Sequence, residues 1–252
     1  MAPDWSAPFS FLSLIYKKRN EWHSSLHYSQ KAVEYNPFDE MAWYNLGIAA
    51  TALQKWELAK KVWQQLGFKL SASHQAPAIN PCPIIVRLNP DTKPEVVLAR
   101  RIDPVRAHIQ SVPQPSSMHG FQDLILFDSK PSGYHIIEGK KFPVYDELQM
   151  IRPSLFFTFA IELETDSVKD VLVLEKLCEE ANLGFDNWSN AYRMVKNDNR
   201  PNAESYDISA FPAAEHDHFL VAIAAEKNTE VMEILEAWKV ISLKNYGTIK
   251  RF

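Results

Sequence analysis

The sequence contains little cysteine and no long apolar run. Only Cys82 and Cys178 occur among its 252 residues, which argues against a framework of disulfide bonds and favours a reducing compartment. No stretch approaches the roughly 18 apolar residues of a membrane helix, and no basic leader precedes an apolar run at the N-terminus. We therefore expect a soluble, cytoplasmic protein that does not interact with a membrane.

Familiar catalytic motifs and an excess of basic charge are missing as well. The chain contains no GxSxG, no Walker loop and no GxGxxG. Its formal net charge is -4, which argues against a nucleic-acid partner. Hydrophobic residues make up 46% and charged residues 23%, as in globular proteins. The length is sufficient for two or three domains.

Two segments at the N-terminus repeat a pattern of large and small side chains. Trp22 and Trp56 lie 34 residues apart. In this register the matching residues are Tyr16, Ala32 and Pro37 in the first unit and Trp43, Leu46, Gly47, Ala59 and Trp63 in the second. Small residues let two helices approach closely, and proline ends a helix. Residues 1–70 resemble a pair of tetratricopeptide (TPR) repeats, that is, N-terminal helical hairpins.

A pair of such repeats is too short for an independent solenoid, which needs about three units. The open face of the helices is therefore expected either to form a short peptide-binding groove or to pack against the rest of the chain. Residues 71–82 are rich in serine, asparagine and proline without an apolar period, which is typical of an extended linker.

Residues 83–150 are predicted to form a small antiparallel β module resembling a barrel. Strands are expected at 83–88, 95–102, 106–112 and 123–127, and after a turn at 131–133 and another at Gly139 the last strand ends near Tyr145. Gly120, Gly133 and Gly139 are expected to adopt positive φ in turns. No polar residues of the module have metal-ligand or nucleophile-base spacing. Asp103 and Asp128 are expected to cap turns, and Arg100, Arg106 and His108 to be solvated.

The C-terminal segment, residues 155–252, is predicted to have the order βαββαβ of a ferredoxin-like domain. Strands are expected at 156–164, 188–195, 218–226 and 246–252. Ser167 and Thr229 are candidate N-caps for the two helices between them. The predicted fold class of the whole chain is therefore α+β.

The C-terminal segment is also strongly acidic. Residues 156–252 contain 17 acidic and 10 basic side chains. Such a charge either steers a basic partner toward this surface or only confers solubility. Tryptophan and tyrosine frequently anchor interfaces. The candidate partner-binding residues are Trp188, Tyr192, Glu204, Asp207, Glu215 and Asp217, with a core position as the alternative for Trp188.

One short motif could contribute to a metal site. His216 and His218 would share one face of a strand, although a third ligand would have to come from elsewhere in the fold. Cys178 falls in the apolar stripe of a predicted helix, where a buried thiol stays protonated. We assign no catalytic residue, no metal and no cofactor from the sequence, with His216 and His218 as weak metal candidates.

Several blocks of the chain carry a resemblance to a family. They are IDPVRAHIQSVPQP, FQDLILFD, PSGY, PVYDEL and FDNWSNAYRMV. Over most of its length from about residue 40, the chain resembles a bacterial family in which short TPR segments precede a module with these blocks in the same order. Where some relatives carry a Cys- and His-rich stretch, this chain has KNDNRPNAESYD. In general type the chain is also similar to immunity proteins, which neutralise toxins by capping them.

Two functional hypotheses follow. In the first, the chain is a cytoplasmic protein that binds another protein, in its most concrete form an immunity protein that occludes the active site of a basic toxin domain. In the second, it is an enzyme or a sensor of a small ligand or metal that uses a cleft between the β module and the C-terminal domain. His216, His218, Asp123 and Asp128 are the polar groups considered for that cleft. A scaffold without a ligand is a third possibility.

Overall fold

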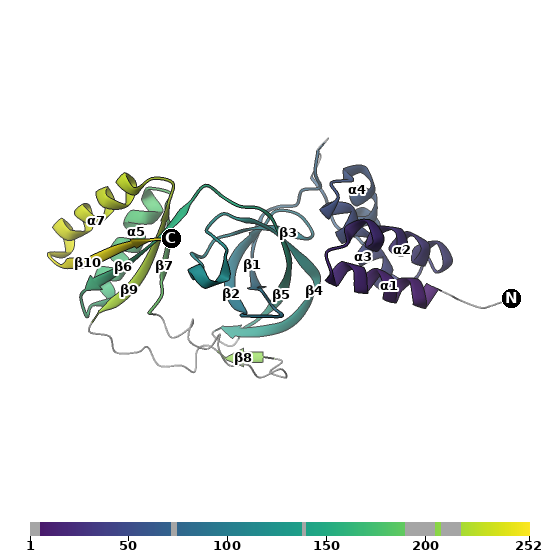
Figure 1. Ribbon diagram of the computed structural model, residues 1–252, viewed down its shortest axis with the longest axis horizontal. Helices are drawn as coiled ribbons and strands as arrows, with labels where there is room; N and C mark the ends of the chain where they lie inside the picture. Colours follow the sequence, from purple (N-terminus) through teal and green to yellow (C-terminus); the bar gives the residue numbers. More distant parts are fainter. Residues whose placement is uncertain (1–5, 72–74, 138–139, 190–204, 208–217) are drawn as a thin grey trace.

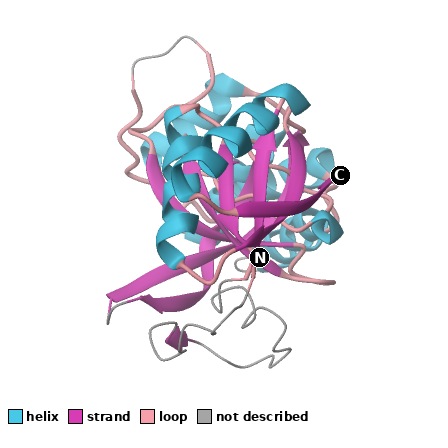
Figure 2. Cartoon of the chain, turned by 90° about the vertical axis from the view of Figure 1, so that its left-hand side faces the viewer, coloured by secondary structure: helices cyan, strands magenta, loops and turns pink. Residues whose placement is uncertain are grey.

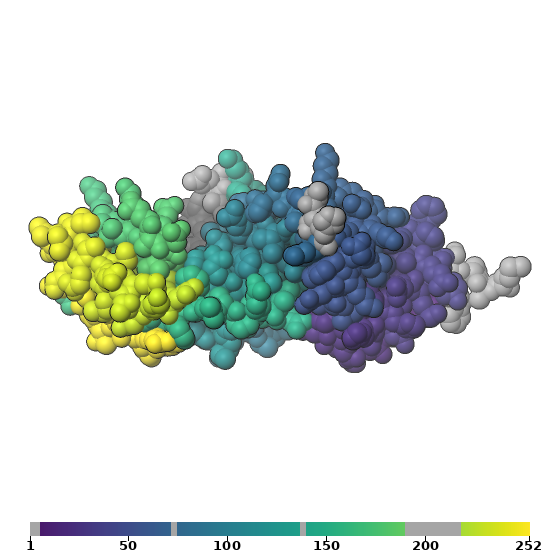
Figure 3. Space-filling model, turned by 90° about the horizontal axis from the view of Figure 1, so that it is seen from above, coloured from purple at the N-terminus to yellow at the C-terminus, as the bar shows by residue number. Residues whose placement is uncertain are grey.

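The computed structural model describes residues 6–71, 75–137, 140–189, 205–207 and 218–252. This part of the chain is a mixed α+β structure with six α-helices, four of them N-terminal, and two β-sheets. The helices, the first sheet and the second sheet follow one another along the long axis (Figure 1). Seen from above, the same order gives an elongated molecule that runs from the purple N-terminal helices to the yellow C-terminal part (Figure 3).

The first four helices form two consecutive hairpins. They are α1 (Ser6–Lys18), α2 (Trp22–Tyr35), α3 (Glu40–Ala52) and α4 (Trp56–Gln65). The second helix of each hairpin begins at a tryptophan, Trp22 or Trp56. At the start of α3 the side chain of Asp39 accepts a hydrogen bond from the Ala42 amide, which satisfies one of the free donors of the first turn.

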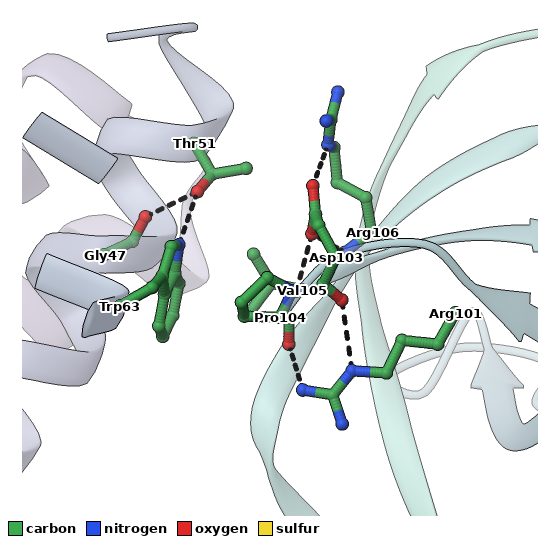
Figure 4. Close-up of polar contacts among 8 residues, drawn as sticks. All are labelled: Gly47, Thr51, Trp63, Arg101, Asp103, Pro104, Val105 and Arg106. Atoms are coloured by element: carbon green, nitrogen blue, oxygen red, sulfur yellow. Dashed lines mark hydrogen bonds and ion pairs between the residues drawn. The ribbon is translucent and has the colours of Figure 1, made fainter. Parts of the chain in front are cut away.

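Helix α3 is buried between the other helices and the first sheet. Leu46, Ile48 and Trp63 share one apolar cluster with Leu126 of the sheet and with Val105, which directly precedes one of its strands. Trp63 also donates from its indole nitrogen to the Thr51 hydroxyl, which in turn donates to the Gly47 carbonyl (Figure 4). The sequence allowed two possibilities for the open face of the helices, a peptide-binding groove or packing against the rest of the chain. In the structure, the first sheet covers this face.

Two polar contacts strengthen this junction between the helices and the first sheet. Lys17 of α1 forms an ion pair with Asp128 at 2.8 Å. The indole nitrogen of Trp22 donates to the Gln149 side chain at 2.6 Å. The Lys17 side chain is only 6% exposed, so breaking this pair would leave a buried charge unpaired.

The first sheet has six strands, and five of them close into a ring. They are β1 (Cys82–Leu88), β2 (Glu95–Arg101), β3 (Arg106–Ile109), β4 (Leu124–Ile137) and β5 (Lys140–Arg152), with β8 (Ser205–Asp207) added at the edge. The order is β3-β2-β1-β5-β4-β8, and an extra β3–β4 pairing joins the ends. Neighbours in this five-strand ring are antiparallel except for β1 and β5.

The turn expected at 131–133 is wrong, because β4 continues through it. Pro131 and Gly133 pair with Tyr145 and Val144 of β5, and the register shifts on either side of Pro131. Proline lacks an N–H and is tolerated in a strand at such irregularities. Gly120 does not adopt the positive φ expected for it, and Gly139 lies outside the described residues. Near this region, positive φ occurs instead at Asn89, Met118 and Gln122.

The second sheet is antiparallel and carries two helices on one face. Its strands are β6 (Phe157–Glu164), β7 (Gly184–Asn187), β9 (Phe219–Ala225) and β10 (Asn245–Arg251), in the order β10-β6-β9-β7. Helices α5 (Val168–Glu180) and α7 (Asn228–Ser242) pack over it through Leu174, Leu235 and Trp238 (Figure 2). The strand expected at 188–195 is wrong in its described part, because β7 ends at Asn187 and residues 188 and 189 form a turn. Residues 190–195 are not described.

The two sheets meet at the loop between β3 and β4. The indole nitrogen of Trp188 donates to the Val112 carbonyl at 2.9 Å, and the Val112 amide donates to Asp186 at 3.3 Å. A Cβ at Gly184 would lie 2.7 Å from the ring of Phe121. The close fit of a glycine against an aromatic ring holds β7 on this loop and fixes the geometry of the cleft described next.

Candidate functional site

A cleft of about 730 Å³ opens between the first sheet and helix α5. Strands β2 and β3 and the loop after β3 form one wall, and α5 with the start of β7 forms the other. The lining residues that determine its chemistry are Arg100, His108, Phe121, Phe156, Glu175 and Glu179. The cleft is thus built from segments that are far apart in the sequence.

The wall formed by the first sheet is basic. Arg100 of β2 lies directly opposite His108 of β3 in the antiparallel register. Their neighbours Ala99 and Ala107 are buried inside the five-strand ring, so alternation directs Arg100 and His108 to its outside. Nδ1 of His108 lies 3.1 Å from the Gln122 carbonyl. Because a carbonyl only accepts, Nδ1 is the donor and Nε2 is left for other contacts.

The wall formed by α5 is acidic. Glu175 and Glu179 are one helical turn apart and exposed. Leu174 and Cys178 point the other way, into the core under the second sheet. Burial, with a smaller contribution from the charge of Glu175, raises the pKa of Cys178 to about 12. This thiol therefore stays protonated and acts as a core residue.

Two aromatic rings also line the cleft. Phe121 and Phe156 meet edge to face with their centroids 5.1 Å apart. Phe121 also touches Gly184 of β7, so the ring is fixed by the contact between the two sheets. A cleft lined by aromatic rings and by charged side chains of both signs can bind an apolar group together with charged groups of either sign.

Arg100, Glu175 and Glu179 of the cleft form no ion pair within the described part of the chain. Other charged side chains of the β module do form ion pairs. Arg87 binds Asp146 through two hydrogen bonds of 2.7 and 2.9 Å, and Arg106 pairs with Asp103 at 2.5 Å. On the walls of the cleft, by contrast, Arg100 lies beside His108, and Glu175 lies one helical turn from Glu179.

The predicted partner-binding residues and the two weak metal candidates, His216 and His218, have varied positions. Trp188 is half-buried and bonded to Val112 at the junction of the sheets. Asp207 belongs to β8, which pairs with the far end of β4. His218 is exposed just before β9. The remaining candidates lie outside the described residues; they are Tyr192, Glu204, Glu215, His216 and Asp217.

The aspartates considered for a cleft have other tasks. Asp123 is buried and accepts hydrogen bonds from the Gly120 and Ser154 amides at 2.8 and 2.7 Å. Asp128 pairs with Lys17. Neither lines the cleft. The sequence assigned no role to Glu175 and Glu179, although their spacing of four on a predicted helix was a readable signal.

The buried side chains of His119 and Glu147 form a pair with a structural role. His119 and Glu147 meet at 2.6 Å with side chains 5% and 7% exposed. The other ring nitrogen of His119 is 2.7 Å from the Ser117 carbonyl, and Glu147 accepts a bond from the Asn89 amide. Burial alone lowers the pKa of His119, but the hydrogen bond and charge of Glu147 outweigh it and raise the pKa above 6.5.

Comparisons with known proteins assign no family. No family model and no curated protein matches the chain. A hypothetical protein from Neisseria gonorrhoeae of known crystal structure is similar over 67% of this chain and 94% of its own, with 13% identity and a TM-score of 0.25. Similarity at this level carries no argument. Among the described residues there is no cluster of metal-ligating side chains and no helix able to cross a bilayer.

Proposed function

We propose that this chain is a cytoplasmic protein that binds another protein. Its most concrete form is an immunity protein that occludes the active site of a basic toxin domain. The observation that carries the proposal is the exposed pair Glu175 and Glu179 at the edge of the cleft. An acidic surface beside a preformed cleft attracts a basic partner and receives one of its segments.

Finer fold assignments form part of the same proposal. Helices α2 and α4 begin 34 residues apart, at Trp22 and Trp56, which supports a TPR pair. The closed pairing of β1 to β5 supports a small barrel. The strand order β10-β6-β9-β7 with two helices on one face supports a ferredoxin-like domain. The bacterial TPR family that the sequence resembles has the same order of parts.

The TPR-like hairpins are not the surface we propose for the partner. Their inner face packs on the first sheet through the cluster around Trp63 and through the Lys17–Asp128 pair. A peptide would have to displace this packing before it could bind there. The acidic helix α5 and the cleft require no such opening.

Co-expression with the product of the neighbouring gene tests the proposal. Growth rescue and co-elution from a size-exclusion column are measured for the wild type and two charge-reversed variants. Glu175→Lys with Glu179→Lys is expected to abolish both. The matched control, Glu226→Lys with Glu233→Lys, makes the same change in charge on the α7 side and should retain them. Absence of a complex with the wild type, or equal loss in both variants, contradicts the proposal.

A small-ligand sensor or enzyme that uses the cleft is the second candidate. The cleft volume of about 730 Å³ falls within the usual range of ligand pockets. Arg100, His108 and the two glutamates would provide the polar contacts. A thermal-shift panel of metals, nucleotides and amino acids tests this candidate, because a ligand at about 100 times its Kd adds about 2.7 kcal/mol. A panel without any shift counts against it.

A further inference from the structure

We infer that the cleft binds a peptide segment in which one basic and one acidic side chain flank an apolar residue. The inference rests on the proposed protein-binding function and specifies the chemistry of the segment that the partner inserts. It is carried by one cleft that Arg100 and His108 of the first sheet, Glu175 and Glu179 of α5, and the rings of Phe121 and Phe156 line together.

The basic wall fits the acidic side chain of such a segment. Residues directly opposite on antiparallel strands have Cβ atoms about 5 Å apart. Arg100 and His108 occupy such a pair, so both side chains can contact one carboxylate. The planar guanidinium of Arg100 can donate two parallel hydrogen bonds to it. The bond from His108 to the Gln122 carbonyl orients its ring beforehand.

The acidic wall fits the basic side chain. Like charges four residues apart on a helix are destabilising, and Glu175 and Glu179 stand in this relation. Lys176, the nearest cation in sequence, pairs with Glu180. A lysine or arginine of the partner placed between Glu175 and Glu179 would replace repulsion by two favourable contacts.

The aromatic rings of the cleft favour an apolar residue between the basic and the acidic side chain of the segment. Phe121 and Phe156 are half-buried and held edge to face, so they offer apolar surface to the middle residue of the segment. A phosphate or nucleotide fits less well, because Glu175 and Glu179 would repel it. A wholly basic segment would be repelled by Arg100. A peptide with both signs matches both walls.

A set of four blocked pentapeptides tests the inference on the full chain. They contain Lys-Leu-Glu, Lys-Leu-Gln, Gln-Leu-Glu or Gln-Leu-Gln between terminal glycines. Binding is followed by NMR through the amide signals of Phe121 and Gly184. The Lys-Leu-Glu peptide is expected to bind about tenfold more tightly than either singly charged peptide.

Variants of the two walls assign each charge of the peptide to its wall. Arg100→Gln should weaken binding of Lys-Leu-Glu without affecting Lys-Leu-Gln. Glu175→Gln with Glu179→Gln should weaken both lysine peptides without affecting Gln-Leu-Glu. These differences form double-mutant cycles between protein and peptide. Arg152→Gln, at an exposed arginine outside the cleft lining, is the matched control and should leave all four affinities unchanged.

Three results would overturn the inference. They are equal affinities for the four peptides, no binding of any peptide at about 5 mM, and variants that weaken all peptides alike. Lower melting temperatures of the wall variants without peptide discrimination would mean that the charges only hold the two sheets together. A failure of the proposed function would give a different result from a failure of this inference. The protein would still distinguish the four peptides, but the charge-reversed α5 variant would still form the partner complex.

Discussion

The indole ring of Trp63 lies so close to Gly47 that a Cβ on Gly47 would be 2.7 Å from its carbon atoms. Trp63 is fully buried, and its nitrogen is bonded to Thr51, whose hydroxyl is bonded to the Gly47 carbonyl (Figure 4). The ring therefore cannot move away without breaking this chain of hydrogen bonds. The absence of a side chain at Gly47 sets the distance between α3 and α4.

Gly47→Ala should consequently destabilise the protein. Overpacking costs about 1–3 kcal/mol, and the better helix propensity of alanine recovers up to about 1 kcal/mol. We expect a net loss of about 1–2 kcal/mol in the free energy of unfolding, measured by urea denaturation. Gly247→Ala is the control, because its nearest neighbour would be 3.7 Å away. A Gly47→Ala protein as stable as the wild type would contradict the tight packing.

Removal of the buried Asp103 carboxylate should be costly. It accepts hydrogen bonds from the Val105 and Arg106 amides at 2.8 and 2.7 Å and pairs with the Arg106 side chain (Figure 4). Arg106 in turn lies over the Trp56 ring of α4, 4.8 Å from its centroid. Asp103→Ala leaves the arginine without its partner, and we expect a loss of about 3 kcal/mol.

The measurement for Asp103→Ala is again the free energy of unfolding. Asp91→Ala, at an exposed loop position, serves as the control and should change stability by less than about 0.5 kcal/mol. Similar, small effects of the two substitutions would show that the Asp103 turn contributes little to the junction of the helices with the first sheet.

The His119–Glu147 pair predicts a pH-dependent stability. The pKa of His119 is raised above 6.5 in the folded state. Its contribution is therefore fully present below the unfolded value of 6.5 and is lost as the pH rises through the folded pKa. We expect urea denaturation between about pH 5.5 and 8.5 to show this loss in the wild type and not in His119→Gln.

His218→Gln is the control for this pH series. His218 is exposed, so the variant should retain the wild-type pH dependence. If His119→Gln and the wild type lose stability in parallel over the same range, the pair with Glu147 is not the source of the pH dependence.

Trp188→Phe tests the junction of the two sheets. The variant keeps an aromatic ring but loses the N–H that donates to the Val112 carbonyl at 2.9 Å. We expect a loss of about 1 kcal/mol and faster amide hydrogen exchange at Val112, whose N–H donates to Asp186. Unchanged exchange there would mean that the indole bond does not hold the junction. Partner binding by the same variant also tests Trp188 as a partner-binding residue.

Local features of the chain were predictable because their causes are local. Trp22 and Trp56, whose 34-residue spacing indicated a repeat, are the first residues of α2 and α4. The apolar stripe of Val171, Leu174 and Cys178 forms the buried face of α5. Helical periodicity depends on residues three or four positions apart, so a short window of sequence contains the information.

Non-local pairing required the tertiary structure. Pro131 and Gly133 have the composition of a turn, but β5 pairs with them and extends β4 through an irregularity. Arg100 and His108 become neighbours only through the β2–β3 register. A register is set by which faces are buried against distant segments, and that is absent from any short window.

The sequence by itself determined the α+β class, the helical hairpins, the strands of the second sheet other than β7, and the acidic character of the C-terminal part. Only the tertiary structure decided that the first sheet covers the inner face of the hairpins and that Glu175 and Glu179 of α5 line one cleft with Arg100 and His108. Propensity and periodicity act between near neighbours, whereas docking depends on the fit of surfaces formed after the elements fold, such as Gly184 against Phe121.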